Sequence, residues 1–191
     1  MGRPRNFETE TVVDRAMDAF WTHGYANTSP AQLAEATGIG KGSLYNTFGS
    51  KRELFERVLN RYDRMGSEVV GEFMARPGTA RECIGAFIRF LVDSDVAQPV
   101  RRGCLAVNTA TEFSARDAEI TKAVRTMQEH TMSALAERID QGRRDGDVAQ
   151  DVDPRAAAEF LMNTIVGLRV MAKTSDAEAL HRIIDTALTT F

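Results

Sequence analysis

The spacing of apolar residues is the feature that most constrains how this chain folds. Apolar side chains recur at intervals of three and four along almost all of its 191 residues. An α-helix turns once in about 3.6 residues, so this spacing places the apolar side chains on one helix face. The sequence therefore predicts an all-α fold of about nine helices. The stripes lie at Val12–Phe20, Leu33–Ala34, Leu44–Phe48, Leu54–Phe73, Ile84–Val92, Leu105–Glu112, Ile120–Ile139, Phe160–Met171 and Leu180–Phe191.

Capping residues mark four of the predicted helix starts. A Ser or Asp at the start accepts a hydrogen bond from a free backbone N–H, and a Glu or Gln three residues later returns one. Because these caps coincide with the apolar stripes, they strengthen the prediction of an all-α fold. The caps are Ser29 with Gln32, Ser50 with Glu53, Ser175 with Glu178, and Asp153 before Pro154.

Composition indicates a globular chain and narrows its location. Hydrophobic residues make up 43% and charged residues 27%, which is enough to bury a core. The sequence shows no charged-then-apolar leader and no apolar run of about 18 residues, so we expect a cytoplasmic protein with no membrane contact. Its two cysteines, Cys83 and Cys104, form no C-x-x-C pair, and we predict no metal site and no cofactor. A net charge of −3 gives no argument for nucleic acid from bulk charge.

Residues 28–48 have the properties of a helix-turn-helix. Gly38 suits a left-handed turn position, where a side chain would clash. Ile39 follows it and can fill the angle between the two helices. Leu44 and Phe48 are spaced to hold the second helix of the pair against the preceding helix. Such a rigid pair projects one helix into the major groove of DNA.

Polar and basic residues surround this helix pair where DNA binding requires them. The first turn of a recognition helix reaches base edges, and a glycine there lets the backbone approach closely. Helix N-termini offer N–H groups to phosphates, and a flexible arm can reach the backbone or minor groove. The candidate DNA-binding residues are Arg3 and Arg5 on the arm, Thr28, Ser29 and Gln32 at one helix start, Lys41, Gly42, Ser43, Tyr45 and Asn46 on the recognition helix, and Lys51 at the next helix start.

The stretches AMDAFWTHGYANTS and QLAEATGIGKGSLYNTFGSKRELF resemble the DNA-binding domain of the TetR family of bacterial regulators, over residues 7–62. The resemblance implies a homodimer, a recognition helix from about Lys41 to Thr47, and a palindromic operator. Gly40 departs from the family, which often has Ser or Thr there, but glycine is an acceptable cap. We therefore predict a helix-turn-helix DNA-binding domain over residues 1–62.

Residues 63–191 are predicted to form an effector-binding and dimerisation domain. The stretch DVDPRAAAEFLMNTIVGLRVMAK resembles the penultimate helix of TetR-family proteins. The resemblance implies that helices near residues 153–173 and 176–191 form the homodimer interface, and Gly167 would permit close helix approach. The alternative is that both helices bury their apolar faces within one protomer.

The stretch RRGCLAVNTATEF, residues 101–113, resembles the Gly-Cys-Leu segment of one TetR subgroup. Some members of that subgroup bind organic ligands and others sense electrophiles or oxidants through the cysteine. Sensing needs a stabilised thiolate. Cys104 would lie near a helix start beside Arg101 and Arg102, and the spacing of Lys173 resembles that of electrophile-sensing members. The alternative is that Cys104 is a small buried apolar residue.

Two further residues complete the tentative effector site. Asn108 and Glu112 are four residues apart on one predicted helix, so both can face a ligand pocket. A buried pair that only satisfies itself is an equal alternative. We read Cys83 as a core residue, and the three histidines as surface or core residues.

These observations predict a DNA-binding transcriptional regulator, a repressor released from its operator by a small-molecule or thiol-reactive effector, with activation as the alternative to repression. The partners expected are double-stranded operator DNA, a second copy of the chain and an effector of unidentified chemistry. The alternative function is a thiol redox protein or small helical enzyme centred on Cys104. That chemistry needs a base near the thiol, and no histidine lies close to Cys104 in the sequence.

Overall fold

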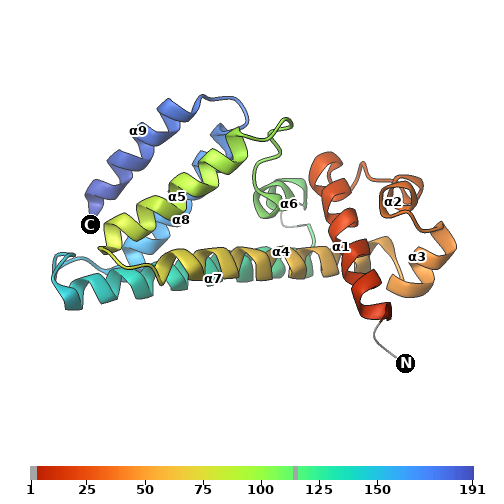
Figure 1. The fold of residues 1–191 in the computed structure, drawn as a ribbon, viewed down its shortest axis with the longest axis horizontal. Helices are drawn as coiled ribbons and strands as arrows, with labels where there is room; N and C mark the ends of the chain where they lie inside the picture. The colour runs from red at the N-terminus through yellow and green to blue at the C-terminus, as the bar shows by residue number, and fades with distance from the viewer. Residues whose placement is uncertain (1–3, 114–115) are drawn as a thin grey trace. The chain divides into compact units, whose positions relative to one another are not determined.

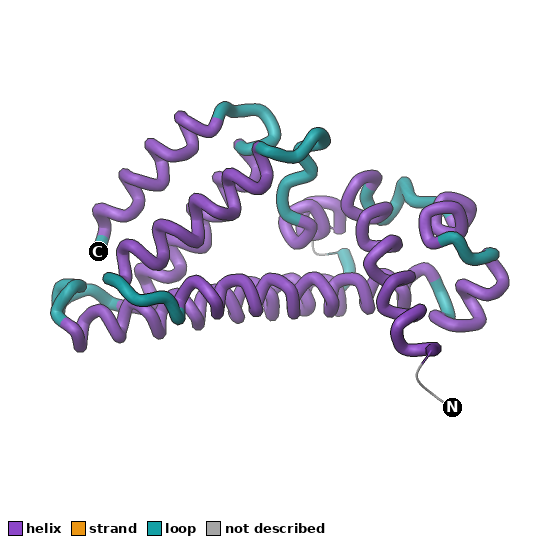
Figure 2. Tube along the Cα trace, in the orientation of Figure 1, coloured by secondary structure: helices purple, strands orange, loops and turns teal. Residues whose placement is uncertain are grey.

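The computed structural model describes residues 4–113 and 116–191 (Figure 1). Within those ranges the chain forms helices joined by loops and turns, with no strand (Figure 2). The predicted all-α fold is therefore confirmed. The elements are α1 (Pro4–His23), α2 (Pro30–Thr37), α3 (Lys41–Phe48), α4 (Lys51–Met74), α5 (Ala80–Val96), α6 (Leu105–Phe113), α7 (Ala118–Asp145), α8 (Pro154–Met171), α9 (Ala177–Ala187) and the short 3-10 helix η1 (Leu188–Thr190).

The helix starts follow from local capping, with one correction. Ser29 and Gln32 form the predicted capping box of α2, and the Asp153 carboxylate accepts from two backbone N–H groups of α8. At α9 the cap is Asp176, not Ser175, because the Asp176 carboxylate reaches the N–H of Ala179. A box that sequence reasoning missed begins α5, where Thr79 and Glu82 exchange hydrogen bonds.

The N-terminal segment differs from the predicted flexible arm. Helix α1 begins at Pro4, which suits a first helical position because that position needs no N–H donor. Arg5 therefore lies on helical backbone. Arg3 lies outside the described residues.

The first compact unit contains the residues up to Met65 together with Asn108–Ala123. It holds α1, α2, α3 and the first part of α4 around a core that includes Phe20, Leu33, Leu44 and Phe55, each at most 1% exposed. The core places α3 at the surface of this unit with one face inward.

The second compact unit contains Gly66–Val107 and Val124–Phe191. Helices α5, α8 and α9 pack around buried aliphatic side chains such as Ile84, Leu161 and Ile184. The predicted functional boundary at residue 62/63 stays a prediction, and the structure adds that residues 108–123 pack with the first unit.

Candidate DNA-binding and effector sites

The turn between α2 and α3 has the geometry that the sequence predicts. Gly38 has φ +74°, and its N–H donates to the carbonyl oxygens of Ala34 and Glu35 at 3.0 and 3.3 Å. The Arg15 guanidinium of α1 donates to the Thr37 carbonyl at 3.1 Å. The C-terminus of α2 is therefore closed by both the glycine and a cation, which suits the negative end of a helix.

Helix α3 presents a polar face outward. Leu44 and Phe48 are 0% and 2% exposed and hold the helix against its unit, as predicted. Successive residues rotate by about 100° around the axis, so Asn46 and Gly42 point away from the buried pair. Lys41 and Ser43 are also exposed, and Tyr45 is half-buried. Four of the five candidates on α3 are therefore accessible to solvent, and Tyr45 is accessible in part.

The residues before and within the first turn of α2 divide into two kinds. Ser29 and Gln32 are exposed, but each already exchanges a hydrogen bond with the other's backbone N–H. Thr28 is 0% exposed, and its hydroxyl donates to the Gly24 carbonyl at 2.5 Å. The prediction that Thr28 contacts DNA is therefore corrected as far as the side chain is concerned, because its buried hydroxyl is hydrogen-bonded within the turn before α2.

Lys51, at the start of α4, packs on an aromatic ring. Its ammonium lies 4.3 Å from the ring centroid of Tyr25, a cation–π distance. Burial lowers the pKa of Lys51, and the nearby Glu112 carboxylate opposes that shift. Burial also raises the pKa of Tyr25. Lys51 is half-buried, so its ammonium is oriented by the protein before any DNA binds.

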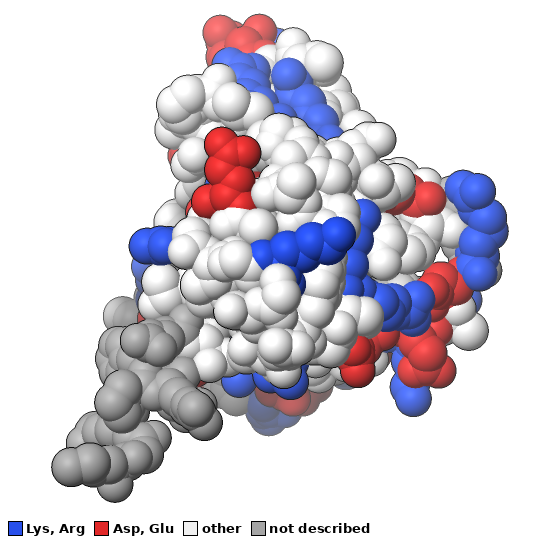
Figure 3. Space-filling view, turned by 90° about the vertical axis from the view of Figure 1, so that its right-hand side faces the viewer, with Lys and Arg blue, Asp and Glu red and all other residues white. Residues whose placement is uncertain are grey.

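Basic side chains on the face seen from the side of α2 and α3 are scattered over a largely uncharged surface (Figure 3). This agrees with the sequence, where eight basic residues stand against seven acidic ones up to residue 62. Net charge therefore gives this face no strong attraction for a nucleic acid, and the position of each cation matters more.

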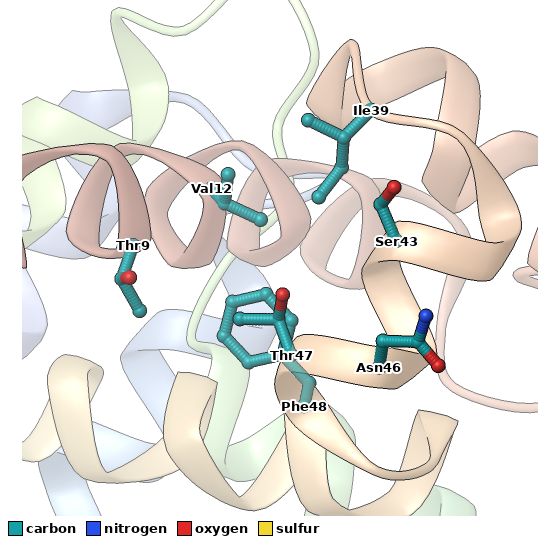
Figure 4. A pocket seen from close by; sticks show the side chains of 7 residues that line it. All are labelled: Thr9, Val12, Ile39, Ser43, Asn46, Thr47 and Phe48. Carbon is teal, nitrogen blue, oxygen red and sulfur yellow. The ribbon is translucent and has the colours of Figure 1, made fainter. Parts of the chain in front are cut away.

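A groove of about 500 Å³ lies between α1 and α3 (Figure 4). Apolar side chains and side chains with hydroxyl or amide groups both line it. Ser43 and Asn46, both predicted DNA-binding residues, line it, while Thr9 and Thr47 were missed by sequence reasoning. The lining residues are Thr9, Val12, Ile39, Ser43, Asn46, Thr47 and Phe48.

Cys104 lies directly before α6, as the sequence predicts, and is half-buried. The residue before it, Gly103, is buried with φ +67°. A Cβ atom at Gly103 would lie 2.7 Å from Cε of Lys173 and 2.9 Å from the Arg169 carbonyl oxygen. The structure thus places Lys173 beside the residue that precedes Cys104.

A buried ion pair holds this loop. The side chains of Asp95 on α5 and Arg169 on α8 are 8% and 10% exposed, and one Arg169 nitrogen lies 2.9 Å from Asp95 Oδ1. The same nitrogen donates to the Gly103 carbonyl at 3.3 Å. Burial raises the pKa of Asp95, while the Arg169 cation opposes that rise. Arg101 also donates to the Ser175 carbonyl at 2.8 Å. The loop before Cys104 is therefore fixed to α8.

Glu112 has partners outside the predicted effector pocket. Its carboxylate accepts from the backbone N–H groups of Tyr25 and Ala26 at 2.8 and 2.5 Å. Five residues later Asp117 pairs with both terminal nitrogens of Arg52, and this hydrogen bonding lowers the pKa of Asp117. These contacts hold Glu112 and Asp117 within the first unit. Asn108 is half-buried on the same helix; its role in sensing stays a prediction.

Helices α8 and α9 present an apolar face that this protomer leaves uncovered. Phe160, Val170 and Met171 of α8 are 40–48% exposed. A Cβ atom at Gly167 would meet nothing within 4 Å, so no packing within the protomer requires that glycine. Between the two helices lies a groove of about 440 Å³ bordered by Phe160 and Ile183.

Cys83 is 2% exposed, in agreement with the predicted core position. Its thiol donates to the Arg76 carbonyl at 3.3 Å and accepts from Arg138 at 3.5 Å. In the described part of the chain, no helix combines the length and apolar composition that crossing a membrane requires.

Comparison with known proteins identifies the family. Residues 12–58 match the bacterial regulatory proteins of the tetR family, and residues 78–187 match the tetracyclin repressor-like C-terminal domain. The chain therefore belongs to the TetR family of bacterial transcriptional regulators. The predicted function as a DNA-binding regulator is confirmed at this level, and the enzyme alternative is set aside because the related proteins are regulators.

Particular relatives span the whole chain. The transcriptional repressor ComR of Escherichia coli is 30% identical over 99% of this chain and 90% of its own. The transcriptional regulator YezE of Bacillus subtilis is 31% identical over 98% of both chains. Among solved structures, a cysteine mutant of the TetR-family regulator CifR in complex with 26bp operator DNA is 33% identical over both full chains, with a TM-score of 0.84.

Proposed function

We propose that this chain is a homodimeric repressor that binds a palindromic operator through α3 and is released by a small-molecule or thiol-reactive effector. The observation that carries the proposal is the helix-turn-helix itself, with Leu44 and Phe48 inward and a polar face outward. The similarity to CifR in complex with operator DNA, and to the repressor ComR, supports it. As a regulator of this kind the protein would act in the cytoplasm.

The proposed DNA-binding set has its centre on α3. Asn46 and Ser43 would reach base edges, and Gly42 would let the backbone approach. Lys41, Lys51 and Arg5 would contact phosphates. Tyr45 would donate to a phosphate from the flank, and Ser29 and Gln32 would help to orient the start of α2.

Operator binding is tested by selecting duplexes from random DNA with the purified protein and measuring affinity at several salt concentrations. We expect Lys41→Ala to weaken binding to all sequences and to lower the salt slope by about two counterions, one for each protomer of the dimer. Asn46→Ala should instead relax base preference at one position. Lys122, an exposed lysine of α7, supplies the control Lys122→Ala, which should leave both unchanged. Failure to enrich any duplex would overturn the proposal.

The dimer is proposed to form through α8 and α9. The exposed Phe160 and Met171, together with the open Gly167, would pack against the same helices of a second copy. In a two-fold interface, the patch on one protomer packs against the same patch on its partner. We expect Phe160→Glu to convert the dimer to a monomer in sedimentation experiments and to weaken operator binding, whereas a dimer that persists would contradict this assignment.

We propose further that the chain is of the subgroup with a Gly-Cys-Leu segment and that Cys104 is the sensing thiol. With hydrogen peroxide, the Cys104 thiolate would attack one oxygen, the O–O bond would break, and hydroxide would leave, giving a sulfenic acid. Lys173 lies beside Gly103 and would favour the thiolate. Asn108 on α6 would contribute to the effector site, whereas the Glu112 carboxylate is already engaged by the backbone N–H groups of Tyr25 and Ala26.

The test is release of operator DNA by peroxide. Wild-type protein should lose its operator on oxidation, and Cys104→Ser should retain it. The matched control Cys83→Ser removes the buried thiol and should behave like the wild type. Release that persists in Cys104→Ser would make Cys104 structural and would direct the search to organic ligands.

A further inference from the structure

The groove between α1 and α3 adjoins the surface that α3 offers to DNA. Ser43 and Asn46 belong to both, because they line the groove and are exposed on α3. In Figure 4 the side chains of Thr9 and Val12 come from one wall and those of Ser43 and Thr47 from the other. A duplex that lies on α3 therefore covers this groove.

The described lining of the groove suits a neutral part of the duplex. The seven described residues that line it are uncharged, whereas phosphate contacts favour Lys, Arg or a helix N-terminus. Val12, Ile39 and Phe48 supply an apolar floor, while Thr9 and Thr47 add methyl groups beside their hydroxyls. Threonine methyl and aromatic groups are the partners that the 5-methyl group of thymine takes in the major groove.

We propose that this groove receives the methyl edge of a thymine in each operator half-site, next to the base that Asn46 contacts. The inference rests on the proposed binding of operator DNA through α3 and adds a specificity element to it. Thr47 is the determining residue from α3 and Thr9 is its counterpart from α1. A volume of about 500 Å³ leaves room for the methyl edge of a base.

The test replaces each thymine of the selected operator in turn by deoxyuridine, which removes only the methyl group. At one symmetric position we expect wild-type binding to weaken about fourfold, the value of one buried methyl group. Thr47→Ser and Thr9→Ser keep the hydroxyl and lose the methyl. Both variants should bind the duplex with thymine and the duplex with uracil at that position with equal affinity. The loss from the serine substitution and the loss from deoxyuridine should therefore not add.

The control is Thr22→Ser, which makes the same chemical change at an exposed threonine of α1 outside the groove. It should keep the fourfold preference for thymine. The inference is overturned if every deoxyuridine is tolerated by the wild type, or if the serine variants keep the full preference. Because those results are read on a duplex that binds, they leave the proposed function standing, whereas failure to bind any duplex overturns both.

Discussion

Two turns of this molecule solve the same conformational problem in different surroundings. The turn before α3 and the loop before α6 each place a glycine in the left-handed region, with φ +74° at Gly38 and +67° at Gly103. Gly38 is exposed, and the nearest atom to an added Cβ is the end of the Arg15 side chain, at 3.3 Å. Gly103 is buried, and its Cβ would meet a backbone oxygen at 2.9 Å. The first turn needs glycine for conformation, and the second needs it for conformation and space.

The contacts that hold the two turns also differ in range. Gly38 is bonded to carbonyls three and four residues before it, so the turn before α3 is largely a local structure. The loop before α6 depends on Asp95 and Arg169, which are 74 residues apart in the chain. A substitution in the local turn can be accommodated by small shifts of neighbouring residues. Removing one member of the buried ion pair instead leaves the other charge buried without a partner.

The largest effect is expected from breaking that buried pair. Arg169→Leu leaves the Asp95 carboxylate buried without its cation, and we expect a loss of about 3–5 kcal/mol in the free energy of unfolding. Chemical denaturation measures it. The double variant Asp95→Leu with Arg169→Leu removes both charges and should recover most of the loss. If the double variant is as unstable as the single one, the ion pair is not what holds the loop before α6.

The next effect comes from Gly103→Ala. The left-handed conformation costs a residue with a Cβ about 1–2 kcal/mol, and the close approach to the Arg169 carbonyl adds an overpacking cost. We expect roughly 2–4 kcal/mol of destabilisation in total, measured by chemical denaturation. A cost no greater than that of Gly38→Ala would remove the distinction between the two turns.

The same contrast explains what the sequence predicts and what it leaves out. Gly38, the cap at Ser29 and the stripe of α3 are local patterns, so the helix-turn-helix is predictable from a few neighbouring residues. Cys104 before a helix start is predictable in the same way.

Contacts between distant residues leave no such pattern. The Asp95–Arg169 pair joins two helices whose periodicity gives no sign of a shared charge. Glu112 lies at helical spacing from Asn108, which allowed either a shared pocket or a buried pair, yet its carboxylate accepts from backbone N–H groups 86 and 87 residues away. Thr28 fits a helix start in the sequence, and only its burial shows that the hydroxyl turns inward.

A smaller effect is expected at the turn before α3. Gly38→Ala meets only the strain of the left-handed conformation, because the Arg15 side chain can move away, so we expect about 1–2 kcal/mol of destabilisation. Thermal unfolding measures it. Arg15→Ala combined with Gly38→Ala should cost no less, since space is not limiting. A clear rescue by the double variant would show that crowding controls this turn too.

The smallest stability effect comes from glycines that have helical conformation and open space. Gly42 on α3 and Gly71 on α4 would each place a Cβ where nothing lies within 4 Å. Alanine is the better helix former, so Gly42→Ala and Gly71→Ala should each stabilise the protein by up to about 1 kcal/mol.

Operator affinity then separates the two variants. Gly71→Ala should bind DNA as the wild type does, because Gly71 belongs to the second compact unit and the proposed DNA-binding residues belong to the first. Gly42→Ala should lose affinity several-fold, because its methyl group stands where the backbone of α3 approaches the bases. If the Gly42→Ala protein is more stable and binds DNA equally well, the backbone of α3 does not approach the bases closely at Gly42. The DNA contacts of α3 would then be assigned to the side that carries Ser43 and Thr47.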